Sequence, residues 1–308
     1  MKPFVRALGV ALTALGLARS GSGADLGMPA PPLKIAKWIK GGPVDLAAGI
    51  ATGTNIYVVE FWATWCPPCR VSIPHLTDLQ KRFKNQGVTV IGISNELEGQ
   101  VRPFVGKQGD QMDYVVALDD GEKTSEAYMK AFEQNGIPHA FVIDRKGRVA
   151  WQGHPMAGLD KAIEEMVAGR FDLEAARRAV EAERRIPDYL DKAAQGADAA
   201  SLRELGDRIL KDGAGQPSLL NEFAWALLTN PRIKTRDVDL ATRAAKAAYD
   251  GTDGKDASIV DTYARAFFVA GKVKEAVELQ KKAVAASREE RERKTLEKTL
   301  QEYQAKLQ

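Results

Sequence analysis

The chain has two cysteines, Cys66 and Cys69, separated by two residues. Two cysteines at this spacing can close a small disulfide or supply half of a metal site. A metal site would need two further soft ligands, but the chain has no other cysteine and only three histidines. The pattern therefore favours dithiol–disulfide redox chemistry, with no metal and no other cofactor.

The residues on either side of the pair predict a strand followed by a helix. Residues 56–61 are β-branched or aromatic apart from Glu60, as in a strand buried on both faces. From Cys69 onward apolar residues recur at helical spacing, and two prolines stand where a helix begins and tolerates them. Cys66 would then lie at a helix N-terminus, whose N–H groups stabilise a thiolate. We therefore expect Cys66 to be the nucleophile and the more buried Cys69 to be the resolving thiol.

The nine residues 61–69, Phe-Trp-Ala-Thr-Trp-Cys-Pro-Pro-Cys, resemble the active-site motif of the thioredoxin superfamily. The Thr-Trp-Cys-Pro-Pro-Cys version is similar to that of its secreted TlpA/ResA-like branch. The resemblance covers about residues 28–170 and includes a strand–helix insertion near 114–132. It implies an α/β thioredoxin fold, in which helices flank a central mixed sheet, and a redox-active disulfide between the two cysteines. It also implies an added hairpin within residues 25–55.

The resemblance also suggests roles for residues outside the cysteine pair. Glu60 lies six residues before Cys66, where thioredoxins place a buried acid that takes the proton of the resolving thiol. Burial would raise its pKa toward that of a useful base; a structural glutamate at a strand end is the alternative. Ile137-Pro138 resembles the thioredoxin segment in which a cis-proline faces the disulfide. Ile137, Pro138 and Trp65 would contact the substrate there.

Residues 1–24 predict a secretory signal. Lys2 and Arg6 provide positive charge, residues 7–18 are apolar, and small residues offer a cleavage site near Ala24. The apolar run is short for a membrane span, although an uncleaved anchor is the alternative. We expect the chain to be exported to a periplasm or an equivalent oxidising space, where disulfides persist.

Beyond residue 170 the composition shifts to Ala, Glu, Arg, Lys and Leu, and apolar residues follow helical spacing to the end. Two segments, Ala241-x6-Ala248 and Ala276-x6-Ala283, lie 35 residues apart. They resemble tetratricopeptide repeats, in which small residues let paired helices pack closely; an ordinary helical bundle is the alternative. The expected parts are a signal peptide at 1–24, a thioredoxin-like domain at 25–170 and an all-α tetratricopeptide-like domain at 171–308.

Together these features predict an exported thiol–disulfide oxidoreductase that reduces disulfides of exported proteins. The resemblance to the TlpA/ResA-like branch implies substrates such as apocytochromes c, and an upstream thiol electron donor that could lie in a membrane. The helical domain would bind a protein partner. The net charge of only +3, without a basic aromatic platform, gives no reason to expect nucleic-acid binding.

Two other functions stay open. The first is a thiol peroxidase, although Ala63 stands at the threonine position of the peroxiredoxin Thr-x-x-Cys arrangement and Thr64 is displaced by one residue. The second is a helical-repeat binding protein in which the redox site is secondary.

Overall fold

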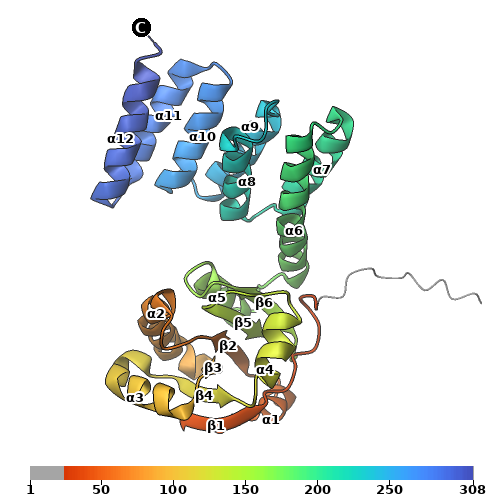
Figure 1. Ribbon diagram of the computed structural model, residues 1–308, viewed down its shortest axis with the longest axis vertical. Coiled ribbons are helices and arrows are strands. Elements are labelled where there is room, and N and C mark those ends of the chain that lie inside the picture. Colours follow the sequence, from red (N-terminus) through yellow and green to blue (C-terminus); the bar gives the residue numbers. More distant parts are fainter. Residues whose placement is uncertain (1–23, 308) are drawn as a thin grey trace, which may run out of the picture. The chain divides into compact units, whose positions relative to one another are not determined.

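The computed structural model of the chain describes residues 24–307 (Figure 1). Contacts between residues divide it into two compact units, the first ending at Leu159 and the second starting at Asp160. The predicted signal peptide lies outside the described residues, apart from Ala24. None of the helices within residues 24–307 combines the length and the apolar character that crossing a bilayer requires.

The first unit contains a six-stranded sheet with intervening helices. Its elements are β1 (Ile35–Lys40), α1 (Leu46–Ala51), β2 (Ile56–Phe61), α2 (Pro67–Phe83), η1 (Lys84–Gln86), β3 (Val88–Ser94), α3 (Glu98–Gln108), η2 (Gly109–Met112), β4 (Val115–Asp119), α4 (Lys123–Ser125), η3 (Glu126–Lys130), β5 (His139–Ile143) and β6 (Val149–Gly153). The strand order is β1-β4-β3-β2-β5-β6. β2, β3 and β4 run parallel, whereas β1, β5 and β6 pair antiparallel with their neighbours. This mixed sheet flanked by helices is the predicted thioredoxin fold.

Side chains along β2 alternate between the two faces of the sheet, because successive strand residues point to opposite sides. Trp62 lies on the side of Glu60, and its ring centroid is 5.5 Å from that of Phe104 in α3. Phe61 points to the other side, where its ring centroid is 6.1 Å from that of Tyr128 in η3. Hence α3 covers the face that carries Glu60, and η3 covers the opposite face.

The hairpin expected within residues 25–55 is not formed in the described part of that segment. β1 is a single strand that pairs antiparallel with β4, and the helix α1 follows it. Two glycines after β1, Gly41 and Gly42, have positive φ values of 64° and 73° and turn the chain. Asp45 then caps α1 by accepting a hydrogen bond from the Ala48 N–H. The capped helix therefore replaces the second strand of the expected hairpin.

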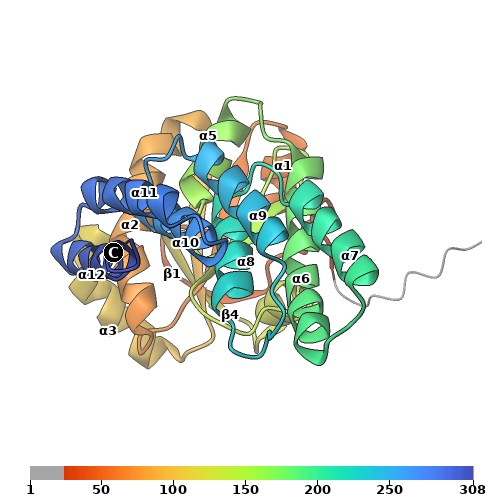
Figure 2. The same cartoon turned by 90° about the horizontal axis from the view of Figure 1, so that it is seen from above.

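The second unit is helical throughout. Its helices are α5 (Leu159–Val167), α6 (Leu173–Gln195), α7 (Ala199–Asp212), α8 (Pro217–Thr229), α9 (Val238–Gly251), α10 (Ala257–Val269), α11 (Val273–Ala286) and α12 (Glu290–Gln304). Consecutive helices pack in pairs, α6 with α7, α8 with α9 and α10 with α11, and α12 packs on α11 (Figure 1 and Figure 2). The first compact unit ends at Leu159, whereas the sequence predicts the boundary between the two domains at residue 170.

Small residues allow these helices to approach closely. The four alanines of the repeated pattern are fully buried: Ala241, Ala248, Ala276 and Ala283. A Cβ atom added at Gly206 of α7 would clash with the side chain of Leu240 in α9. Larger side chains at such positions would push the helices apart.

Candidate active site

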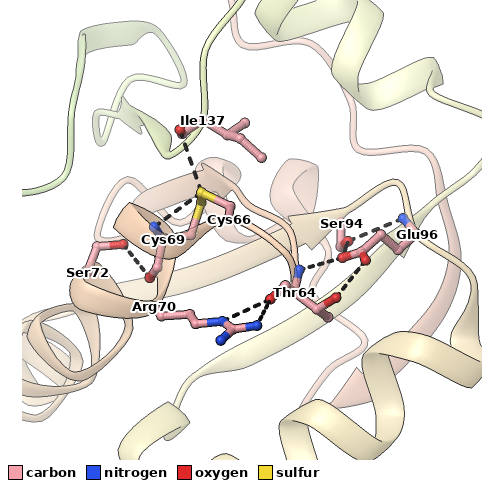
Figure 3. The surroundings of a disulfide bond; sticks show 8 residues. All are labelled: Thr64, Cys66, Cys69, Arg70, Ser72, Ser94, Glu96 and Ile137. Atoms are coloured by element: carbon pink, nitrogen blue, oxygen red, sulfur yellow. Dashed lines mark hydrogen bonds between the residues drawn. A yellow bond between two sulfur atoms is a disulfide. The ribbon is translucent and has the colours of Figure 1, made fainter.

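Cys66 and Cys69 form a disulfide at the start of α2 (Figure 3). The S–S distance is 2.06 Å, and the two Cα atoms are 5.3 Å apart. Cys66 occupies the N-cap position of the helix. Both residues are almost completely buried, with 2% of Cys66 and 0% of Cys69 exposed. The structure therefore shows the oxidised state of the pair, with its sulfur atoms largely shielded from solvent.

The first turn of α2 offers one backbone hydrogen bond to the sulfur of Cys66. Pro67 and Pro68 have no N–H, so the first N–H of the turn is that of Cys69. It donates to Cys66 Sγ over 3.2 Å. In the reduced protein, this N–H and the dipole of a 17-residue helix favour a thiolate at Cys66.

The segment before β5 lies against the disulfide. The Ile137–Pro138 peptide bond is cis, and the Ile137 carbonyl oxygen lies 3.7 Å from Cys66 Sγ (Figure 3). A disulfide sulfur carries no hydrogen, so this contact can be a hydrogen bond only when Cys66 is a thiol. The fold thus brings together Cys66 and Ile137, which are 71 residues apart in the chain.

Exposed apolar side chains flank the buried sulfur atoms. Trp65 is 67% exposed and Val71 is 64% exposed, and Pro67 and Pro68 are also exposed. A group of exposed apolar residues next to a reactive site is typical of a surface that contacts another protein.

Thr64, two residues before Cys66, is held from two directions (Figure 3). The Glu96 carboxylate accepts hydrogen bonds from the Thr64 N–H over 2.6 Å and from its hydroxyl over 2.7 Å. The Arg70 guanidinium donates to the Thr64 carbonyl oxygen through Nε, over 3.0 Å, and Nη2, over 2.7 Å. The Ser94 hydroxyl donates to Glu96 over 3.2 Å. These bonds fix the backbone that leads into Cys66.

Sequence reasoning did not single out Glu96 or Arg70. A signal for Glu96 exists, because the polar run Ser94-Asn95-Glu96 begins at the end of β3. β2 and β3 are parallel neighbours, so their carboxyl ends lie at one edge of the sheet. Polar residues that follow β3 were therefore candidates for contact with the loop after β2.

Glu60 is fully buried in β2, with 0% exposed. Neither oxygen of its carboxyl group has a hydrogen-bond partner in the described chain. Burial raises the pKa of this carboxyl group to about 8, because the charged form loses its hydration. A carboxyl group with such a pKa can take up and release a proton near neutral pH.

Among residues 24–307, no cluster of three or more His, Cys, Asp or Glu side chains has an arrangement that could bind a metal ion.

Parts of the chain are similar to known proteins. Residues 26–152 match the AhpC/TSA family. Protein FixW from Rhizobium leguminosarum is 28% identical over 165 residues, which are 51% of this chain and 72% of FixW. Thiol-disulfide oxidoreductase ResA from Bacillus cereus (strain ZK / E33L) is 36% identical over 98 residues, 32% of this chain and 53% of ResA.

A crystal structure of a thiol:disulfide interchange protein of the thioredoxin family from Chlorobium tepidum TLS is 30% identical. The matched region covers 46% of this chain and 97% of the Chlorobium protein, with a TM-score of 0.39. The chain spans about half the length of the ResA relatives it matches. Residues 26–152 of the first unit thus match the AhpC/TSA family, and the chain is similar to proteins named as thiol–disulfide oxidoreductases.

Proposed function

We propose that this chain is an exported thiol–disulfide oxidoreductase that reduces disulfides of exported proteins through Cys66 and Cys69. The observation that carries the proposal is the Cys66–Cys69 disulfide at the N-terminus of α2, beside the Ile137 carbonyl group. The similarity to ResA, a thiol-disulfide oxidoreductase, supports the reaction class. Export rests on the signal pattern of residues 1–24.

In the proposed reaction the reduced protein acts first through Cys66. Its thiolate attacks one sulfur of the substrate disulfide, and a new S–S bond joins Cys66 to the substrate. The S–S bond of the substrate breaks, and its second sulfur leaves as a thiolate. The Cys69 N–H, 3.2 Å from Cys66 Sγ in the disulfide, supports negative charge on the attacking sulfur.

Cys69 then resolves the mixed disulfide. In the role proposed for Glu60, its carboxylate accepts the proton of the Cys69 thiol, and the resulting thiolate attacks Cys66 Sγ. The bond between Cys66 and the substrate breaks, and the substrate leaves with both sulfur atoms reduced. Its two electrons come from the Cys66–Cys69 dithiol, which becomes the disulfide of this structure. An upstream dithiol donor must return the pair to the reduced state.

The proposed substrates are exported proteins with disulfides, including apocytochromes c. The exposed rim of Trp65, Val71 and the two prolines would contact the substrate chain, and the backbone of Ile137 and Pro138 would hydrogen-bond with it. We also propose that the helical pairs of the second unit form a tetratricopeptide-like domain. Their buried alanines support this reading, and a protein partner would bind there.

A thiol peroxidase has less support from the site. A peroxidase of the peroxiredoxin kind needs a threonine hydroxyl beside the reactive sulfur. Ala63 stands at that position, and the hydroxyl of Thr64 is engaged by Glu96 at 2.7 Å. Measuring hydroperoxide consumption by the reduced protein would test this function directly.

The proposal is tested by reducing the purified protein and following disulfide reduction in insulin. The wild-type chain should transfer two electrons per protein to insulin. Cys66→Ser should abolish the transfer, and Cys69→Ser should accumulate a mixed disulfide through Cys66. Equal activity in Cys66→Ser and wild type would refute the proposal.

A further inference from the structure

Three buried polar side chains on one face of the sheet have no hydrogen-bond partner in the described chain. Their unpartnered atoms are both carboxyl oxygens of Glu60, the hydroxyl oxygen of Tyr114 and Nε1 of Trp62. All three residues are buried: the exposed fraction is 0% for Glu60, 5% for Tyr114 and 2% for Trp62. Buried polar atoms in folded proteins are nearly always hydrogen-bonded, so several such atoms around one residue call for a shared partner.

The three side chains surround Gly92 of β3. Gly92 is the register partner of Glu60 in the parallel pairing of β2 with β3, so the two residues face the same side of the sheet. A Cβ atom at Gly92 would lie 3.0 Å from Tyr114 Cε2 and 3.1 Å from Trp62 Nε1. Tyr114 directly precedes β4, the next strand in the sheet. Two chain segments, one at the end of β2 and one before β4, therefore bring these groups together beside Gly92 of β3.

The pKa of Tyr114 supports their proximity. Burial raises this pKa well above its ordinary value of 10.0, and the negative charge of Glu60 raises it further.

The hydrogen-bonding capacities of the three groups are complementary. A carboxylate only accepts, an indole N–H only donates, and a tyrosine hydroxyl does both. The groups make no hydrogen bond with one another. A single water molecule is the smallest partner that can bridge them, since it donates two hydrogen bonds and accepts two.

We infer that Tyr114 and Trp62 hold one buried water molecule against the carboxyl group of Glu60, and that Tyr114 is a positioning residue for Glu60. When Glu60 is ionised, the water donates to the carboxylate and accepts hydrogen bonds from the Tyr114 hydroxyl and the Trp62 N–H. When Glu60 is protonated, its O–H donates to the water, and the water donates to the Tyr114 oxygen. The hydroxyl of Tyr114 lets the network satisfy both protonation states.

The catalytic consequence rests on the proposed function. Glu60 is proposed to take the proton of the Cys69 thiol, and the network would stabilise the carboxylate that must be present before this transfer. Loss of the Tyr114 hydroxyl would then raise the pKa of Glu60. The pH midpoint of the resolving step would move to higher pH.

The site itself is tested by infrared difference spectra of the oxidised full-length protein across the titration of Glu60. The C=O stretch of protonated Glu60 is assigned by its loss in Glu60→Gln. We expect Tyr114→Phe to move this band to higher frequency, because without the Tyr114 hydroxyl the water is no longer held and the carboxyl group loses its hydrogen bond with it. Gly92→Ala should do the same, because the added methyl group lies against Tyr114 and Trp62 and leaves no room for the water.

Tyr128→Phe is the matched control. The hydroxyl of Tyr128 is on a side chain buried at the opposite face and donates to the Pro31 carbonyl oxygen over 2.7 Å, so its removal should leave the band in place. If the C=O band keeps its wild-type frequency in both Tyr114→Phe and Gly92→Ala, the inference is overturned. A shift in Tyr114→Phe with none in Gly92→Ala would overturn the water site, because it indicates a direct hydrogen bond. The spectra need no substrate, so their outcome is independent of the reductase assay.

Discussion

Glu60 in β2 and Glu96 in the loop after β3 are two carboxyl groups from neighbouring parts of the same sheet, and they differ in burial and in hydrogen bonding. Glu60 lies within β2, fully buried, and makes no hydrogen bond in the described chain. Glu96 follows the end of β3 by two residues and accepts hydrogen bonds from Thr64 and Ser94. Burial without partners favours the neutral acid at Glu60, whereas the donors around Glu96 fix the position of its side chain.

We propose that the two carboxyl groups have different tasks. A carboxyl group with a pKa of about 8 can exchange a proton with a thiol near neutral pH. A carboxylate held by three donors is suited to hold the Thr64 backbone in place. Substitutions at the two positions should therefore affect different properties of the protein.

The largest expected effect is the dependence of stability on pH that Glu60 causes. Its folded-state pKa of about 8 lies above its ordinary value of 4.5. Below pH 4.5 both states bind the proton, and as pH rises the unfolded state releases it first. The free energy of unfolding should therefore fall between about pH 4.5 and 8, by up to about 5 kcal/mol.

Urea denaturation of wild type and Glu60→Gln across this pH range measures the effect as a difference between two slopes. Glu60→Gln should lose the slope, and Glu96→Gln should keep it. Parallel curves for wild type and Glu60→Gln would show that burial does not shift the protonation of Glu60.

The second effect concerns the resolving step. Glu60→Gln removes the proposed proton acceptor of Cys69 without a large change in size. Resolution of the mixed disulfide at neutral pH should slow by roughly 100-fold or more, while attack by Cys66 should keep its rate. Rapid-quench measurement of mixed-disulfide lifetime separates the steps, and an unchanged lifetime would exclude the role.

Glu96→Gln should produce the third effect. The amide has one acceptor oxygen, so it cannot replace both hydrogen bonds from Thr64, which reach different carboxylate oxygens. We expect a loss of about 2 kcal/mol in the free energy of unfolding, since charged groups make the stronger hydrogen bonds. Attack by Cys66 should slow several-fold while resolution by Cys69 changes little. The reverse pattern would assign the proton-transfer role to Glu96 instead.

Arg70→Met should have the smallest effect. The side chain is exposed, and its two hydrogen bonds reach the Thr64 carbonyl oxygen, to which water can also donate a hydrogen bond. A loss of about 1 kcal/mol is expected in thermal or urea unfolding. Arg70→Lys is the matched control, because it retains the positive charge but lacks a guanidinium group that donates two hydrogen bonds. It should recover part of the lost stability.

Much of the site follows from the local sequence. Residues 56–61 indicate a buried strand, and the two prolines after Cys66 mark the start of a helix, so both cysteines could be placed at its N-terminus. The burial of Glu60 also follows from its position in an otherwise apolar strand. These features depend on neighbours within about ten residues, where periodicity and helix-start signals are informative.

Other features depend on which strands are neighbours and in what register. The contact of Glu96 with Thr64 requires β2 and β3 to be parallel and adjacent, and the convergence on Gly92 requires the register that places it opposite Glu60. Local sequence patterns predict neither the strand order nor the register. The expected hairpin before β2 was wrong because it came from the resemblance, while the residues themselves contain a helix cap at Asp45.

The most direct test of the central claim is the reduction potential of the Cys66–Cys69 couple, measured in dithiothreitol or glutathione buffers. A protein that reduces disulfides in an oxidising space needs a strongly reducing couple. We expect a reversible two-electron couple near the thioredoxin value of about −270 mV. A value near about −120 mV, as in strong disulfide oxidants, or the absence of any reversible couple would contradict it.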